Sequence, residues 1–156
     1  KLREESVDDS GILTVQGEES GQAYISIGAD GENEIHTYFG ANLKLTPENL
    51  SDPERINLIK QAKICVIMDP PIETAKRLAE ICQKSSVTVI WDPGVYALRG
   101  INILAPVLRN VDYFILNHHE YKNRGAWSSG SAAGGSQSFD LDFFYKVLSP
   151  YRELGV

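Results

Sequence analysis

The stretch KICVIMD, residues 63–69, decides the fold of this chain, because an apolar run of strand length stops there on a carboxylate. Two later stretches repeat the pattern, VTVIWD at residues 87–92 and VDYFILN at residues 111–117. Short apolar runs rich in β-branched and aromatic residues are typical of strands buried in a parallel sheet. The second half of the chain therefore predicts three strands, each with a polar residue at its carboxyl end.

The residues at these three ends are Asp69, Asp92 and Asn117. In open α/β sheets, ligands bind in the crevice outside the carboxyl ends of the strands. We therefore expect Asp69, Asp92 and Asn117 to line one crevice, and we place the candidate functional site there.

The segments between the predicted strands have helical periodicity. Residues 73–84 carry an apolar stripe spaced for packing on a sheet, and residues 101–109 do the same around Pro106, which can shorten or kink a helix. A βαβαβ order favours the α/β class. We expect a parallel, three-layer, Rossmann-like sheet with helices on its faces.

The first forty residues predict a different architecture. Residues 12–16, 22–28 and 34–39 each alternate apolar and polar side chains and are separated by glycine-containing turns. Such alternation is typical of strands with one buried and one solvated face. We expect residues 1–42 to form an antiparallel β meander that serves as a lid or as a sheet edge.

Residues 43–156 are expected to form the α/β core. Two helix starts are predicted at Thr46 and at Asp52, each followed by a proline and an acidic residue. Residues 124–137 are almost all small or polar, which is the composition of a flexible tether. Residues 139–148 again show an apolar stripe and predict a further helix.

Composition excludes several classes of protein. The chain has 156 residues, 23% of them charged, and a net charge of −6 without a cluster of basic residues, so nucleic acid is not an expected partner. No apolar run approaches the ~20 residues of a membrane-spanning helix, and the first residues lack the apolar segment of a signal peptide. We expect a cytoplasmic location. Cys65 and Cys82, the two cysteines, are interpreted as reduced core thiols, and a disulfide or a metal role is the alternative.

Several motifs, taken in order, resemble those of the ribokinase family, the pfkB-type carbohydrate and nucleoside kinases. They are LREESVDDSGI at residues 2–12, GENEI at 31–35, GAN at 40–42, LTPE at 45–48, DPPIET at 69–74, DPG at 92–94 and NHHE at 117–120. Each motif is weak alone, but their order and spacing together are specific. The resemblance implies an ATP- and Mg²⁺-dependent kinase that phosphorylates a hydroxyl of a sugar or nucleoside.

On the substrate side, the resemblance implies contacts from Asp69, Asn42 and Asn33. The family usually has Glu where this chain has Asp69, so the carboxylate here has a shorter reach. From the residues alone, Asp69 also suits the opening of a Pro-Pro turn, and Asn33 suits the turn that it shares with Glu32.

On the nucleotide side, the resemblance implies that Asn117, Glu120 and Asp92 lie near the phosphates, with Asn117 and Glu120 organising the magnesium ion. Phosphoryl transfer needs such charge neutralisation, together with a base that accepts the hydroxyl proton. Local chemistry offers an alternative, in which Asn117 caps a helix whose first turn contains Glu120. Asp92 similarly fits a turn with the proline and glycine that follow it.

The resemblance also implies which parts of the family are not in this sequence, namely the Gly-Gly sugar-binding turn, the glycine-rich anion hole and the catalytic Asp. We therefore expect no catalytic base within the chain, and a central fragment of a kinase that is inactive alone. The alternative is a non-catalytic, engineered or truncated α/β scaffold. In either case, the partners would be the missing kinase segments or a second copy of the chain.

Overall fold

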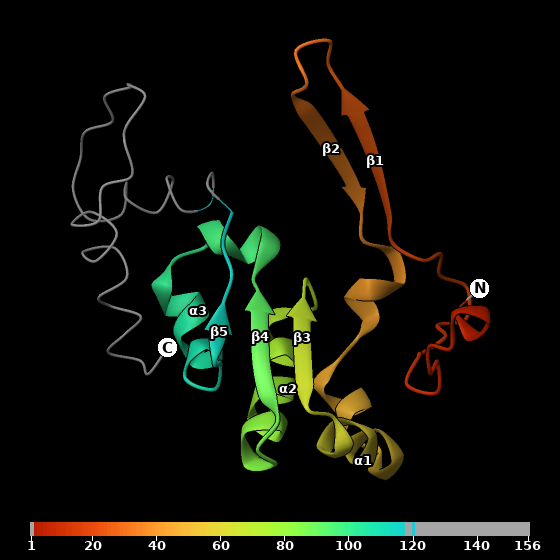
Figure 1. The fold of residues 1–156 in the computed structure, drawn as a ribbon, viewed down its shortest axis with the longest axis vertical. Coiled ribbons are helices and arrows are strands. Elements are labelled where there is room, and N and C mark those ends of the chain that lie inside the picture. The colour runs from red at the N-terminus through yellow and green to blue at the C-terminus, as the bar shows by residue number, and fades with distance from the viewer. Residues whose placement is uncertain (1, 118–119, 121–156) are drawn as a thin grey trace.

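The computed structural model describes residues 2–117 and residue 120. The predicted tether at residues 124–137 and the predicted helix at residues 139–148 lie outside the described residues. Figure 1 shows a small sheet backed by helices and a two-stranded hairpin that extends away from it.

The three central strands form one parallel sheet, as predicted. They are β3 (Ile64–Met68), β4 (Thr88–Asp92) and β5 (Tyr113–Phe114), in the spatial order β3-β4-β5 (Figure 1). The last strand is shorter than expected, although the backbone N–H of Ile115 still donates to the carbonyl of Trp91 at 2.9 Å. The carboxyl ends of all three strands therefore meet at one edge of the sheet.

Two crossover helices, α2 (Ile72–Lys84) and α3 (Ile101–Leu108), connect these strands. A right-handed crossover between neighbouring parallel strands places its helix on a fixed face, so both helices lie on the same side of the sheet. Figure 1 shows α2 behind the sheet. Pro106 lies within α3 without ending it. The described residues thus hold one helical layer and the sheet, and they do not test the third layer of the prediction.

The core lies between the sheet and these helices. Alternate strand residues point into it, and Ile67, Val89 and Trp91 are each at most 1% exposed. Trp91 packs against Phe114 of β5, with ring centroids 5.4 Å apart. Three residues of the predicted α2 stripe, Ala75, Ala79 and Cys82, are buried in the same cluster. The periodicity of the sequence therefore identified the packed faces correctly.

The N-terminal meander was predicted incorrectly in two respects. Strands β1 (Gln22–Ile27) and β2 (Asn33–Tyr38) pair antiparallel, but residues 12–16 form no strand, because no neighbouring backbone pairs with them. The expected buried face is also absent from the described part of the chain, since every residue of β1 and β2 is exposed. Alternation shows which side chains share a face, whereas burial needs a second layer, and the hairpin projects away from the core (Figure 1).

Short helices join the hairpin to the sheet. They are η2 (Gly40–Lys44), η3 (Pro47–Ser51) and α1 (Pro53–Gln61), while η1 (Arg3–Glu5) lies near the N-terminus and η4 (Gly94–Leu98) follows β4. None of the helices within residues 2–117 has both the length and the apolar character needed to cross a bilayer.

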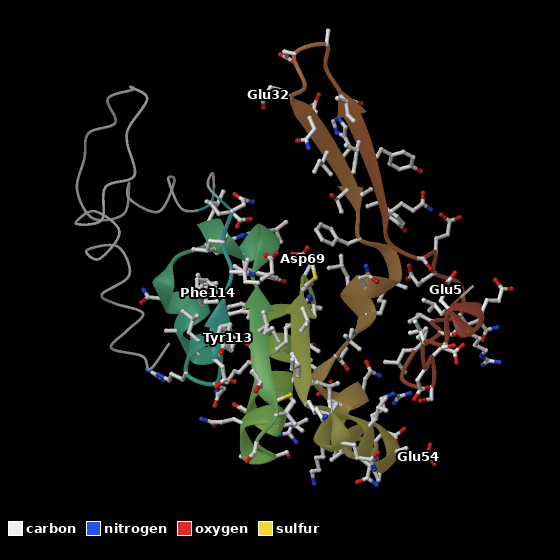
Figure 2. The ribbon with its side chains drawn as sticks, in the orientation of Figure 1. Glu5, Glu32, Glu54, Asp69, Tyr113 and Phe114 are labelled. Atoms are coloured by element: carbon white, nitrogen blue, oxygen red, sulfur yellow. The ribbon has the colours of Figure 1, made fainter. Side chains whose placement is uncertain are left out.

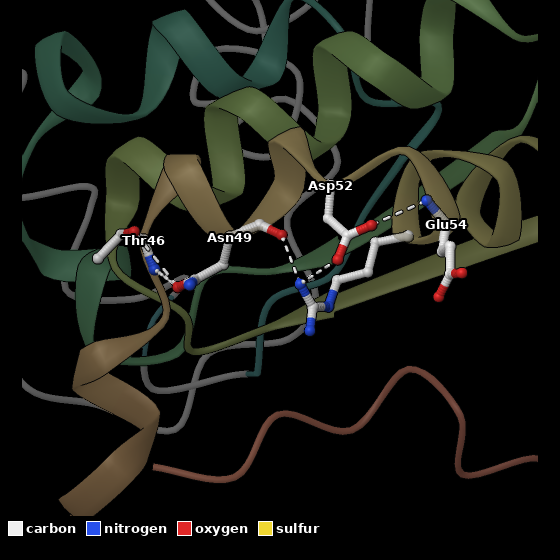
Figure 3. Close-up of polar contacts among 5 residues, drawn as sticks. Thr46, Asn49, Asp52 and Glu54 are labelled. Carbon is white, nitrogen blue, oxygen red and sulfur yellow. Dashed lines mark hydrogen bonds and ion pairs between the residues drawn. The ribbon is translucent and has the colours of Figure 1, made fainter. Parts of the chain in front are cut away.

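Both predicted helix starts are confirmed by their capping contacts (Figure 3). The N–H of Thr46 donates to Asn49 Oδ1 at 2.8 Å, and the N–H of Glu54 donates to Asp52 Oδ1 at 2.9 Å. Side-chain oxygens thus accept from backbone N–H groups at the starts of η3 and α1, where the helix leaves such groups without partners.

One buried hydrogen bond ties this connection to the core. The hydroxyl of Thr74 in α2, which is fully buried, donates to the carbonyl oxygen of Leu45 at 2.7 Å. Because Thr74 is away from water, losing the Leu45 carbonyl as a partner would leave its hydroxyl unsatisfied. This bond holds the chain leaving the hairpin against the first turn of α2.

Replacing Leu104 with alanine should destabilise the fold by about 2–5 kcal/mol, because its fully buried side chain fills the space between α3 and the sheet. The matched control is Ile103→Ala on the same helix, where the side chain is 44% exposed and the loss should stay below about 1 kcal/mol. Urea unfolding followed by far-UV circular dichroism measures both. Equal losses for the two variants would contradict this assignment of the core.

Candidate active site

The edge at which the three parallel strands end carries the predicted polar residues. Asp69 follows β3 directly, Asp92 is the last residue of β4, and Asn117 comes shortly after β5. Figure 2 shows Asp69 at this edge. The parallel topology thus places these residues at one edge of the sheet. Asp69 lines the cavity described below, whereas Asp92 and Asn117 are not among its lining residues, so the expectation that all three line one crevice stays a prediction.

Asp69 joins the ends of β3 and β4. Its Oδ1 accepts a hydrogen bond from the backbone N–H of Val95, in η4, at 3.3 Å. Asp69 also has a left-handed backbone conformation, with φ of 51°. Among residues other than glycine, aspartate is one of the few that adopt this conformation readily. The carboxylate is thereby held over the turn that follows β4.

Gly94 makes that contact possible. Its φ is +48°, and a Cβ built on it would lie 2.6 Å from Cγ of Asp69 and 2.9 Å from Oδ2. Any side chain at this position would therefore collide with the carboxylate. Sequence reasoning noted Gly94 only as part of a turn, and the sequence signal for its role is an Asp-Pro-Gly directly after a strand.

Asp92 takes the turn role that local chemistry offers. Its Oδ1 accepts from the N–H of Gly94 at 3.0 Å, which closes an Asx turn around Pro93. The side chain is only partly exposed. Asp92 thus shapes the loop that Asp69 contacts, and its carboxylate lies at the same edge of the sheet.

Asn117 and Glu120 form a reciprocal capping pair. The N–H of Asn117 donates to Glu120 Oε2 at 3.0 Å, and the N–H of Glu120 donates to Asn117 Oδ1 at 2.9 Å. This is the geometry of a capping box, so the local alternative is borne out for this pair. The carboxylate and amide oxygens keep further lone pairs for a hard cation or for its water.

The side-chain oxygens of Asn117 and Glu120 suit a magnesium ion that is bound by few protein ligands. Among the described residues, no group of three or more His, Cys, Asp or Glu side chains is placed to hold a metal ion. Mg²⁺ usually keeps several waters and takes one or two carboxylates together with substrate phosphates. Glu120 and Asn117, held in fixed orientation by their mutual hydrogen bonds, fit such a site.

A cavity of about 760 Å³ lies where the base of the hairpin meets the end of β3. Asp69 and Asn42 both line it, together with residues 11–16 and Lys44. Asn42 is held close to Gly21, where an added Cβ would lie 2.5 Å from Nδ2 of Asn42. The structure thus brings together two of the three residues predicted to bind the substrate. Residues 12–16, predicted as a strand, form part of the wall.

Asn33 is placed elsewhere. It is the first residue of β2 and pairs with Ile27 next to the turn of the hairpin. Figure 2 shows Glu32, its neighbour, at the far end of the hairpin, away from Asp69. The N–H of Glu32 donates to Asp30 Oδ1 at 3.1 Å, so this segment has the geometry of a turn. The substrate role of Asn33 stays a prediction, without a contact to the cavity.

Comparison with known proteins identifies the family. Residues 1–123 match the sequence profile of the pfkB family of carbohydrate kinases. The chain belongs to this family. The family match covers every residue of the candidate site, from the cavity at the hairpin base to the capping pair after β5.

Individual pfkB relatives agree with this assignment. The ribokinase of Staphylococcus aureus (strain COL) is 30% identical over 87 residues, which are 56% of this chain and 28% of that protein. The ribokinase structure from Giardia lamblia has a TM-score of 0.71 at 23% identity, over 98% of this chain and 44% of that one. Arabidopsis thaliana ribokinase complexed with ribose and ATP has a TM-score of 0.63 at 22% identity, and the match covers 88% of this chain and 40% of that one. The chain therefore shares the fold but spans less than half of each.

Replacing Gly94 with alanine should cost more stability than a positive φ alone explains, because the methyl group would collide with the Asp69 carboxylate. The control is Gly17→Ala, where φ is +79° and the added methyl group meets nothing within 4 Å, so about 1–2 kcal/mol is expected. In a background with Asp69→Gly, the cost of Gly94→Ala should fall to that of the control. Urea unfolding of the four variants gives the coupling free energy. Simple additivity would show that the two residues do not touch.

Proposed function

We propose that this chain supplies the central part of an ATP- and Mg²⁺-dependent kinase that phosphorylates a hydroxyl group of a sugar or a nucleoside. The observation that carries the proposal is the gathering of Asp69, the Asp92 turn and the Asn117–Glu120 pair at the carboxyl edge of one parallel sheet, in a pfkB family chain. The names of its relatives, ribokinases among them, support a pentose as the acceptor. ATP availability makes the cytoplasm the proposed location.

On the acceptor side, we assign Asp69 and Asn42. A carboxylate accepts hydrogen bonds from sugar hydroxyls, and an amide can both donate and accept. Both residues line one cavity, whose volume of about 760 Å³ lies in the range of small-molecule sites. Asn33 belongs to the proposal only as a residue of the hairpin tip, which would have to fold over the cavity to reach a substrate.

On the nucleotide side, we assign Asn117, Glu120 and Asp92. Catalysis of phosphoryl transfer depends mainly on positioning and on neutralising the charge of the phosphates. The capping bonds hold the carboxylate of Glu120 in place before any ligand arrives, so little ordering remains for binding. Bound Mg²⁺ would supply the positive charge at the phosphates, and Asp92 would keep the neighbouring loop in shape.

The proposal leaves the catalytic base to other segments of the kinase. Among the residues assigned above, Asp69 accepts from the N–H of Val95, Glu120 from that of Asn117 and Asp92 from that of Gly94, so each of these carboxylates already has a positioning role. The chain spans about 28% of the ribokinase from Staphylococcus aureus. We therefore propose that this polypeptide alone does not turn over.

A second candidate function is a scaffold that needs a partner, and one observation favours it. The face of the sheet opposite α2 and α3 carries apolar side chains that are each at least half exposed: Ile64, Val66, Met68, Tyr113 and Ile115. Exposed apolar patches of this kind mark interaction sites. Complementary kinase segments or a second copy of the chain would cover this face.

The activity of the chain is tested by a coupled assay for ADP with ribose and a panel of nucleosides. The chain alone should give no turnover, and co-expression with the complementary segments of a ribokinase should give ATP-dependent phosphorylation. In that complex, Glu120→Gln should lower kcat by about 10-fold or more by weakening magnesium, as expected for a lost charge contact. Turnover by the chain alone would overturn the fragment proposal.

The matched control for Glu120→Gln is Glu54→Gln. Glu54 also lies in the first turn of a helix, and Figure 2 shows it at the bottom of the molecule, away from Asp69. The Glu54→Gln variant should therefore leave kcat unchanged. Equal losses for both variants would indicate a general effect on folding and would remove Glu120 from the site.

We expect that the chain associates with complementary segments, or with a second copy of itself, through the exposed face of the sheet. Val66→Lys should abolish binding of the complementary segments, or self-association where it occurs, because a charge would be buried without a partner. Leu43→Lys, at another exposed apolar position, is the control and should bind as the wild type does. Size-exclusion chromatography with light scattering measures both. Unchanged association of the Val66 variant would place the partner elsewhere.

A further inference from the structure

The two cysteines of the chain lie in adjoining parts of the core although they are distant in the sequence. The carbonyl of Cys82 accepts from the N–H of Val87 at 3.0 Å, and Val89, two residues further on, pairs with Cys65 across the sheet. Cys65 is on β3, and Cys82 is close to the end of α2, the helix that leads back along that strand. Cys82 is fully buried in the core cluster, and Cys65 packs against that cluster while remaining partly exposed. Both are free thiols in this structure. The sequence favoured two reduced core thiols over a disulfide, because the distance between the cysteines depends on how α2 lies against the sheet.

The environments of the two thiols differ in a way that assigns them different chemistry. A hydrogen bond between the side chains lowers the pKa of Cys65 and raises the pKa of Cys82, and burial raises the pKa of Cys82 further. Cys65 is thus the thiol that ionises first. The thiolate is the nucleophilic form of cysteine. The more exposed member of the pair is therefore also the more reactive one.

We propose that Cys65 and Cys82 form a peroxide-sensitive dithiol that closes into an intramolecular disulfide joining β3 to α2. In the first step, the Cys65 thiolate attacks one oxygen of hydrogen peroxide, the O–O bond breaks, and the departing hydroxide takes a proton to become water. Cys65 is then a sulfenic acid. In the second step, the Cys82 sulfur attacks the Cys65 sulfur, the S–O bond breaks, and a second water leaves with the Cys82 proton. Two thiols are oxidised and one peroxide is reduced to two waters.

The placement of the pair gives the disulfide a consequence for the site. The covalent loop runs through the end of β3, the turn containing Asp69, and most of α2. Closing this loop restricts the unfolded chain and fixes the spacing between strand and helix. Since Asp69 is positioned by the end of β3, oxidation would lock the segment from which its carboxylate reaches Val95.

The test treats the full chain with graded hydrogen peroxide and measures free thiols after denaturation, together with intact mass. The wild type should lose both thiols and two hydrogens, yield a cross-linked peptide containing Cys65 and Cys82, and regain both thiols with dithiothreitol. Its thermal midpoint should rise on oxidation and fall back on reduction. Two thiols that stay free while glutathione is oxidised, or disulfides formed only between chains, would overturn the proposal.

Single variants separate the roles of the two cysteines. Cys82→Ala should stop at the Cys65 sulfenic acid, which dimedone traps, and Cys65→Ala should give neither dimedone adduct nor disulfide. Circular dichroism first establishes that each variant is folded, and Cys82→Ser serves where the alanine variant is not. Equal reactivity of Cys82 in the Cys65→Ala variant would contradict the assignment of Cys65 as the reactive thiol.

Discussion

The parallel pairing of β3 with β4 is the constraint on which the rest of the structure depends. Its register places Met68 opposite Asp92, so the residues that follow the two strands emerge side by side. The pairing is held by burial of the helix-facing side chains, of which Ile67 and Trp91 are almost completely removed from water. Burial of large apolar side chains is worth about 1.5–3 kcal/mol each, enough to hold a site at the edge of the sheet.

The site itself is assembled from turns rather than from the strands. Asp69 and Gly94 both adopt positive φ angles, and the carboxylate of Asp69 lies over the Asp92 turn as a result. Residues in sparsely populated backbone regions persist when the surrounding structure over-determines them, and they gather at functional sites. The pfkB family assignment and this local geometry therefore point to the same edge of the sheet for independent reasons.

Much apolar surface of the described residues remains exposed. It includes the hairpin face with Ile25, Ile27 and Ile35, and the sheet face with Val66 and Met68. A self-contained domain seldom exposes surfaces of this kind, whereas an element that packs against further segments does. The proposed partner follows from this exposed apolar surface, whereas the proposed kinase role rests on the polar residues at the carboxyl edge of the sheet. The proposed dithiol of Cys65 and Cys82 does not depend on these exposed surfaces, because both cysteines belong to the packed core between β3 and α2.

Elements whose signals are local could be predicted from the sequence. Apolar runs predicted β3 and β4, periodicity predicted the buried stripe of α2, and capping side chains predicted the helix starts, because each signal acts over one or two turns of chain. Features that depend on residues distant in the chain became apparent from the packing of the folded chain. Residues 12–16 found no strand partner, the hairpin found no covering layer among the described residues, and Asn33 was separated from Asn42. The contact of Asp69 with the β4 turn and the meeting of Cys65 with Cys82 belong to this second group, because packing alone sets the distance between residues far apart in the chain.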